Sequence, residues 1–129
     1  MPSRWVRDRA FAVLLIAAVA CSHGKPGAPP EPRPEPILVH VKNENFLDMN
    51  VAVVVSGVSR RLGQVQGNSA ADFKLDYMMT VGQSITIIGT PIGGQGFATS
   101  GPLNVGEGQT IDFQIGSTLR QSSASIRNP

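Results

Sequence analysis

The segment ILVHVKNENFLDMNVAVVV, residues 37–55, has the pattern of two strands joined by a turn. At its start, apolar residues alternate with their neighbours at Ile37, Val39 and Val41. This alternation places the three side chains on one face of a strand. Residues 43–45 (Asn-Glu-Asn) favour a turn. The apolar run 51–55 has the length of a strand and is typical of a central strand that is covered on both faces.

Similar short runs continue to the end of the chain, separated by Gly, Asn, Ser and Pro. Further strands are expected over residues 60–65, 71–75, 84–89, 95–99 and 111–115. Gly63 is a candidate bulge within the first of these. Residues 120–129 are either a frayed tail or a late edge strand.

Seven or eight short strands in about 90 residues predict an all-β fold, an antiparallel β-sandwich. It would be immunoglobulin-like or a partly open barrel, although the paired cysteines and core Trp of true immunoglobulin domains are absent. The expected core consists of Val39, Val41, Phe46, Val53, Val55, Leu62, Val65, Phe73, Leu75, Ile85, Ile87, Ile111, Phe113 and Ile115.

Composition and charge narrow the class of protein. The chain has 129 residues, of which 41% are hydrophobic, too many for a wholly disordered protein. Its net charge of +2 lies entirely within residues 1–20, because residues 21–129 hold eight basic and eight acidic side chains. No basic face is therefore expected, which argues against nucleic acid as a partner.

The first twenty residues have the features of a secretory signal peptide. Arg4, Arg7 and Arg9 form a positively charged start, and residues 11–20 (FAVLLIAAVA) form an apolar run. Ten apolar residues are too few to span a bilayer as a helix. We therefore expect residues 1–20 to direct export and the rest of the chain to lie outside the cytoplasm.

The only cysteine of the sequence follows this run directly, as Ala18-Val19-Ala20-Cys21. This motif resembles the lipobox of bacterial lipoproteins, although that family usually has Leu where this chain has Ala18. The resemblance implies cleavage before Cys21 and attachment of the protein to the membrane through acyl chains on that residue. Two or more chains anchor a protein stably where one is marginal. The alternative is an ordinary signal peptide and a secreted protein with a free thiol.

Ser22 stands where inner-membrane lipoproteins of Gram-negative bacteria usually have Asp, so the resemblance favours the outer membrane, facing the periplasm, in such a cell. Residues 22–36 (SHGKPGAPPEPRPEP) contain six prolines and no large apolar side chain. With Cys21, this stretch is expected to be a disordered linker, residues 21–36, with an extended polyproline shape. The sandwich domain is then expected over residues 37–129.

The folded part also resembles small uncharacterised bacterial lipoprotein domains. The resemblance covers residues 37–75 and rests on VKNENF (41–46), DMNV (48–51) and RLGQV (61–65). It implies structural roles alone: Asn43 and Asn45 would cap the turn, and Phe46 would close one end of the sandwich. It brings no known activity.

Signals for catalysis are weak. His40 is the only histidine of the expected domain, and alternation places it on the face opposite Val39 and Val41, toward solvent. The sequence has no Gly-x-Ser-x-Gly elbow. Asp72 and Asp76 would lie on one face of a strand, roughly 13 Å apart, too far for a pair of catalytic carboxylates. An enzyme is therefore not expected.

Signals for metal or phosphate are equally weak. Oxygen ligands for calcium occur at Asn45, Asp48 and Asn50, and soft ligands for copper at His40, Met49, Met78 and Met79. Neither set has the spacing that such sites usually show. Residues 93–96 (Gly-Gly-Gln-Gly) lack the lysine and helix of a phosphate loop and are expected to form a flexible hairpin. No cofactor and no metal site are predicted.

The remaining candidate is an interaction surface, consisting of Tyr77, Met78, Met79, Gly93, Gly94 and Phe97. Exposed apolar patches of this kind mark contact sites, although burial at the ends of the sandwich would account for the same residues. The sequence thus predicts a lipid-anchored, non-enzymatic interaction or structural module with an envelope protein as partner. The alternative is a small-ligand or copper carrier in the envelope.

Overall fold

A computed structural model describes residues 27–129 of the chain. The expected signal peptide, the lipobox-like motif and Cys21 lie outside the described residues. Within residues 27–129, no helix is long and apolar enough to cross a membrane. Residues 27–36 contain neither helix nor strand, and a compact unit spans Pro32–Pro129.

Eight strands and two single-turn 3₁₀ helices make up this unit. In chain order they are β1 (Ile37–Asn43), β2 (Met49–Val55), β3 (Val58–Val65), β4 (Ser69–Leu75), η1 (Tyr77–Met79), β5 (Ile85–Pro91), β6 (Ala98–Leu103), β7 (Thr110–Ile115), η2 (Leu119–Gln121) and β8 (Ser123–Arg127).

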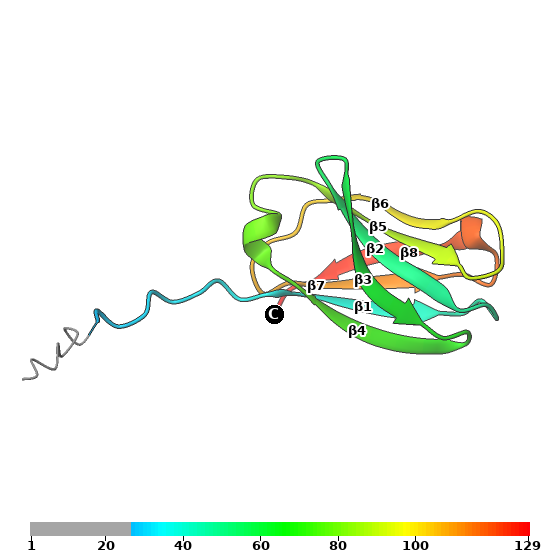
Figure 1. Ribbon diagram of the computed structural model, residues 1–129, viewed down its shortest axis with the longest axis horizontal. Coiled ribbons are helices and arrows are strands. Elements are labelled where there is room, and N and C mark those ends of the chain that lie inside the picture. The colour runs from blue at the N-terminus through cyan, green and yellow to red at the C-terminus, as the bar shows by residue number, and fades with distance from the viewer. Residues whose placement is uncertain (1–26) are drawn as a thin grey trace, which may run out of the picture. The chain divides into compact units, whose positions relative to one another are not determined.

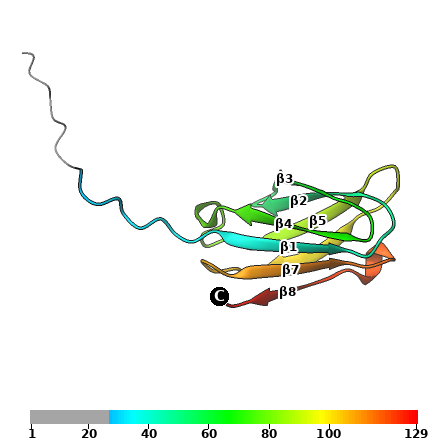
Figure 2. The same cartoon turned by 90° about the horizontal axis from the view of Figure 1, so that it is seen from below.

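The strands form two four-stranded sheets that pack face to face (Figures 1 and 2). One sheet has the order β4-β1-β7-β8 and the other has the order β3-β2-β5-β6. All neighbouring strands are antiparallel except β1 and β7, which are parallel. The predicted β-sandwich is confirmed, and the sheets do not close into a barrel. The strand order differs from that of an immunoglobulin constant domain, where the first two strands share a sheet.

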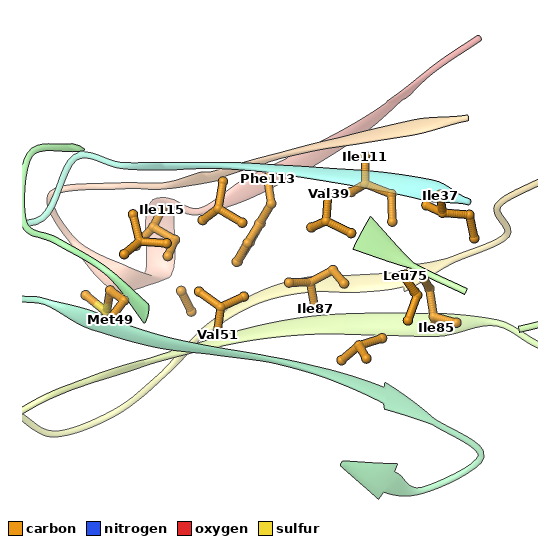
Figure 3. Packing of buried hydrophobic residues seen from close by; sticks show 14 residues of the cluster. Ile37, Val39, Met49, Val51, Leu75, Ile85, Ile87, Ile111, Phe113 and Ile115 are labelled. Carbon is orange, nitrogen blue, oxygen red and sulfur yellow. The ribbon is translucent and has the colours of Figure 1, made fainter. Parts of the chain in front are cut away.

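The core lies between the two sheets and is lined by alternate residues of their strands (Figure 3). Because side chains alternate across a strand, every second residue of β1, β5 and β7 and of most of β2 is buried in it. Its fully buried apolar members are Ile37, Val39, Val41, Met49, Val51, Val53, Val65, Leu75, Ile85, Ile87, Ala98, Ile111, Phe113 and Ile115.

Strand β2 is interior to its sheet, between β3 and β5, but only one of its faces is covered. Val51 and Val53 are fully buried, whereas Ala52 and Val54 on the opposite face are half-buried. The expectation of a strand covered on both faces was therefore wrong. A two-layer sandwich has one core, so no second layer lies over the outer face of β2.

The bulge expected at Gly63 is confirmed. Val51 pairs with Gly63 and Ala52 pairs with Arg61, so Leu62 is the extra residue of β3. A side chain at Gly63 would place its Cβ 2.5 Å from Cε1 of Phe73. Glycine at this bulge thus lets the ring of Phe73 lie against the backbone of β3.

The structure defines two strands near the end of the chain whose bounds the sequence did not predict. The edge strand expected over 95–99 is instead β6, which continues through Gly101 and Pro102. An edge strand tolerates the proline at 102 because one side of it lacks a partner. For residues 120–129, the alternative of a late edge strand is correct, since β8 pairs with β7 over residues 123–127.

Phe46 does not belong to the core: its side chain is 77% exposed. Strand β1 ends at Asn43 and β2 begins at Met49, so Phe46 lies in the connection between the two sheets. Strand alternation therefore does not apply to it. Three other expected core residues, Val55, Leu62 and Phe73, are partly buried and pack against the core from its margin.

Two matched substitutions test this reassignment. Phe113→Ala removes a ring that is 1% exposed, and we expect it to lower the free energy of unfolding by about 3–5 kcal/mol. Phe46→Ala removes an exposed ring, and we expect a change below about 0.5 kcal/mol. Urea unfolding of both variants measures the difference. Equal losses would show that Phe46 is part of the core after all.

Candidate interaction surface at the distal loops

The two ends of the sandwich carry different groups. We call the end where β1 begins, at Ile37, the linker end, and the end where β1 finishes, at Asn43, the distal end. Asn43 pairs with Ser69 and Ile115, and Met49 pairs with Pro91, which places four connections at the distal end. Residues 44–48, 66–68, 92–97 and 116–122 form these connections, the distal loops. Figure 3 shows Met49 and Ile115 at one end of the core, far from Ile37 and Ile85.

Asn43 fastens two of the distal loops with one buried side chain. It is 1% exposed, and its Nδ2 donates to the carbonyl oxygens of Leu47 (2.8 Å) and Gln66 (3.0 Å). Its Oδ1 accepts from the backbone N–H of Asn45 at 3.0 Å. A buried amide satisfied on both ends fixes the path of the backbone around it.

Asn45 repeats this arrangement two residues later. Its Oδ1 accepts from the N–H of Leu47 at 3.0 Å, and its Nδ2 donates to the carbonyl of Ser117 at 2.9 Å. Its own carbonyl accepts from the N–H of Asn68 at 2.9 Å. The capping roles expected for Asn43 and Asn45 are confirmed, and they extend across the β7–β8 connection.

Asp48 ties the remaining loop to this network. Its Oδ1 accepts from the N–H of Gly67 at 2.9 Å, and its carbonyl accepts from the N–H of Ile92 at 2.8 Å. A Cβ at Gly67 would lie 2.1 Å from the carbonyl oxygen of Phe46, so only glycine allows this approach. Within residues 27–129, no buried side-chain nitrogen or oxygen lacks a hydrogen-bond partner.

Exposed apolar side chains project from these fastened loops. Phe46 is 77% exposed, Phe97 is 60% exposed and Ile92 is 42% exposed. The hydrogen bonds of its neighbours hold the backbone at Phe46, so its exposure does not result from a loose loop. A large ring held in water by a rigid backbone is a feature of contact sites.

Sequence reasoning placed Phe46 in the core and overlooked Ile92. The sequence feature that indicates an exposed Phe46 is its place in Asn-Glu-Asn-Phe-Leu-Asp, where turn-forming and polar residues flank a single aromatic ring.

The structure separates the predicted interaction surface into two groups. Gly93, Gly94 and Phe97 lie in a distal loop, where a Cβ at Gly94 would meet Cδ1 of Leu47 at 2.8 Å. Tyr77, Met78 and Met79 form η1, which follows β4 at the linker end (Figure 1). Met78 is exposed, whereas Tyr77 and Met79 pack against the core. The six residues therefore do not form one continuous patch.

Asp76 has a local role that the sequence did not indicate. Strand β4 ends at Leu75, and Asp76 caps η1 by accepting from the N–H of Met78 at 2.9 Å. It does not share a strand face with Asp72, as the regular alternation had suggested.

His40 lies in a polar row on the outer face of the β4-β1-β7-β8 sheet. Its register partners are Asp72 on β4 and Asp112 on β7, and Asp112 in turn pairs with Ser125 on β8. Nδ1 of His40 lies 2.5 Å from Oδ1 of Asp72. The solvent-facing position expected for His40 is confirmed. Within residues 27–129, the hydrogen-bond partner of the His40 ring is the carboxylate of Asp72.

Asp112 forms a two-pronged ion pair with Arg127, in which Nε faces Oδ2 and Nη2 donates to Oδ1 at 2.9 Å. The hydrogen bond from Arg127 holds the pKa of Asp112 below its ordinary value, against the opposing effect of burial. At the distal end of the same face, Lys42 and Gln114 lower the pKa of Glu44 in the same way. The Asp112–Arg127 pair joins β7 to β8, whereas the Lys42–Glu44 pair lies at the end of β1.

The side chains considered for metals are dispersed or already engaged. Side-chain oxygens of Asn45, Asp48 and Asn50 accept from Leu47, Gly67 and Arg61 respectively. Met49 is buried at the distal end, and Met78 lies on η1 at the other end. Across residues 27–129, no three His, Cys, Asp or Glu side chains converge to hold a metal ion.

Comparisons with known proteins add little. No family model and no curated protein matches the chain. Among solved structures, it is similar to one described as the NMR structure of the protein from Eubacterium rectale, at 17% identity and a TM-score of 0.47. That similarity covers 80% of this chain and 97% of the other. At this level of similarity the neighbour carries no information about function.

Replacing Asn43 tests whether its amide fastens the distal loops. Asn43→Ala leaves the carbonyls of Leu47 and Gln66 without their donor, and we expect a loss of about 2–4 kcal/mol in the free energy of unfolding. The control Asn50→Ala removes a surface hydrogen bond to Arg61 and is expected to cost below about 1 kcal/mol. Urea unfolding compares the two. A cost at Asn43 no larger than at Asn50 would contradict the network.

Proposed function

We propose that this protein is a lipid-anchored module of the bacterial envelope that binds a partner protein through its distal loops and catalyses no reaction. The observation that carries the proposal is the exposure of Phe46 on a loop fastened by Asn43 and Asn45. The anchor rests on the signal-like residues 1–20 and the lipobox-like motif ending at Cys21.

The fastened loop favours binding for an energetic reason. Association immobilises flexible groups at a free-energy cost, and a backbone that is already fixed avoids much of that cost. A phenylalanine side chain contributes about 1.5–3 kcal/mol when a partner removes it from water. Phe46 and Phe97 would thus serve as anchor residues, and Ile92 would add to the apolar area between loops.

The chemistry of the distal end favours an apolar partner surface. Both acidic side chains of the distal loops are engaged within the domain, since Glu44 pairs with Lys42 at 2.9 Å and Asp48 accepts from Gly67 and Gln64, while Arg120 on η2 is exposed. Residues 21–129 carry no net charge. An apolar groove on another envelope protein fits this end better than a strongly charged ligand does.

The position of the linker is compatible with this role. It joins the sandwich at Ile37, the end opposite the distal loops. Attachment through Cys21 would therefore leave Phe46 and Phe97 free. If the cell has an outer membrane, Ser22 favours anchoring there, facing the periplasm. A copper or small-ligand carrier remains the alternative, but no observation on the described residues favours it.

Metabolic labelling tests the anchor. Radioactive palmitate should label the wild-type protein in its bacterium, and Cys21→Ser should abolish the label because it removes the thiol that would carry the lipid. The measurement is fluorography of the immunoprecipitated protein. An unlabelled wild-type protein would rule out the lipid anchor and leave the loop proposal standing.

Site-specific photo-crosslinking in intact cells tests the loops. A photoreactive residue at position 46 or 97 should capture the same partner, and one at Val58 should not. Val58 is a matched control because it is 66% exposed and apolar but lies at the linker end. Phe46→Ser should reduce capture from position 97 about tenfold, the equivalent of ~1.4 kcal/mol. Capture from position 58 alone, or no capture from 46 and 97, would refute the proposed surface.

A further inference from the structure

Strand β8 is an edge strand whose outer side has no partner within residues 27–129. It lies at the margin of the β4-β1-β7-β8 sheet and pairs with β7 alone (Figure 2). Unpaired backbone groups on such an edge are a template for another strand. The sequence left this segment open as a tail or an edge strand, and the proposed function makes no use of it.

Hydrogen bonds of the neighbouring strands show which groups of β8 point outward. Leu38 and Glu44 donate to the carbonyls of Gln109 and Ile115, so odd-numbered residues of β7 direct their backbone groups toward β1. Even-numbered residues of β7 therefore face β8, where they pair with odd-numbered residues of that strand. The N–H and C=O groups of Ala124 and Ile126 then point away from the sheet.

The other three edges carry features that discourage pairing, and β8 carries fewer. Strand β3 has Arg60, Arg61 and a bulge, β4 has Asp72 and Lys74, and β6 has Pro102 beside Gly101 at φ +69°. Charges, bulges and proline are the usual protections of an edge. The sequence of β8 is Ser-Ala-Ser-Ile-Arg, and its one charge, Arg127, is engaged by Asp112 within the same sheet.

We propose that β8 pairs with β8 of a second copy of this chain, antiparallel and about a two-fold axis at Ser125. The two four-stranded sheets would then join into one continuous sheet of eight strands. This register sets Ala124 opposite Ile126 of the second copy, which are the residues whose backbone groups point outward. Two such pairs give four backbone hydrogen bonds, and every residue of β8 has a partner.

The side chains of β8 fit this register on both faces. On the core side, Ile126, which is 36% exposed, lies against the half-buried Ala124 of the second copy, so apolar surface leaves water. On the outer side, Arg127 faces Ser123 and Ser125 faces Ser125. No like charges oppose each other directly. The distal loops stay free because they lie at the strand ends and not along the edge.

Cysteine trapping tests the register in the full-length protein in its own membrane. Residues that face each other in a non-hydrogen-bonded antiparallel pair have Cα atoms about 4.5 Å apart, within the range that a disulfide bridges. Ser125→Cys should therefore form a disulfide-linked dimer on mild oxidation, seen on a non-reducing gel. Ser123→Cys, the matched control, faces Arg127 and should form at least tenfold less. The unsubstituted chain reports any linkage through Cys21.

A second variant tests the pairing without a crosslink. Ser125→Lys sets two lysines opposite each other in the dimer, while in each protomer the lysine lies beside Asp112, which favours the folded chain. Light scattering of the detergent-solubilised full chain should give twice the protomer mass for the wild type and the protomer mass for Ser125→Lys. Circular dichroism should show unchanged strand content for the variant.

Three outcomes would overturn the proposal. Equal trapping at positions 123 and 125 would show that the contact is random collision. A wild type that is monomeric on the membrane, with no trapping at 125, would show that the edge has no such partner. A disulfide from position 125 to a different protein would show that another chain occupies the edge. None of these outcomes bears on the distal loops, whose test is independent.

Discussion

The buried amide of Asn43 is the constraint on which the distal end of this molecule depends. Strand β1 belongs to one sheet and β2 to the other, so the chain must cross between layers directly after Asn43. A crossing exposes backbone groups that have no partner strand, and Asn43 and Asn45 supply those partners from their side chains. The same bonds reach the β3–β4 and β7–β8 connections, so one crossing fixes three loops.

This arrangement links stability to the proposed contact site. The loops contribute few side chains to the apolar core between the sheets, because the buried core residues lie in the strands. Core packing therefore does not explain why the polar residues Asn43 and Asn45 are buried at the distal end. Their burial is explained if they hold Phe46 and its neighbours in one conformation, since a fixed loop binds a partner with a smaller loss of entropy. The exposed edge of β8 does not depend on this loop network, because the pairing register with β7 determines which backbone groups of β8 point outward.

Sequence patterns predicted the strands well where alternation was regular, as at 37–42, 71–75 and 111–115. They failed where the physical cause was not local. Phe46 looked like a core residue because it is aromatic, but its burial depends on how the chain crosses between sheets. The strand expected over 95–99 runs instead from Ala98 to Leu103, because an edge strand accepts the proline at 102. Strand order and the parallel β1–β7 pair depend on contacts between distant segments, which one sequence does not encode in its periodicity.

Amide hydrogen exchange, followed by NMR, tests most directly whether the side-chain network holds the distal loops rigid. We expect the amides of Asn45, Leu47, Gly67 and Asn68 to exchange as slowly as those of interior strands, because each donates to an internal acceptor. Amides of Gly93 and Gly94, on the exposed part of the β5–β6 connection, should exchange fast. Exchange of the first four amides at the rate of Gly93 would contradict a rigid distal end, since Phe46 would then lie on a mobile loop.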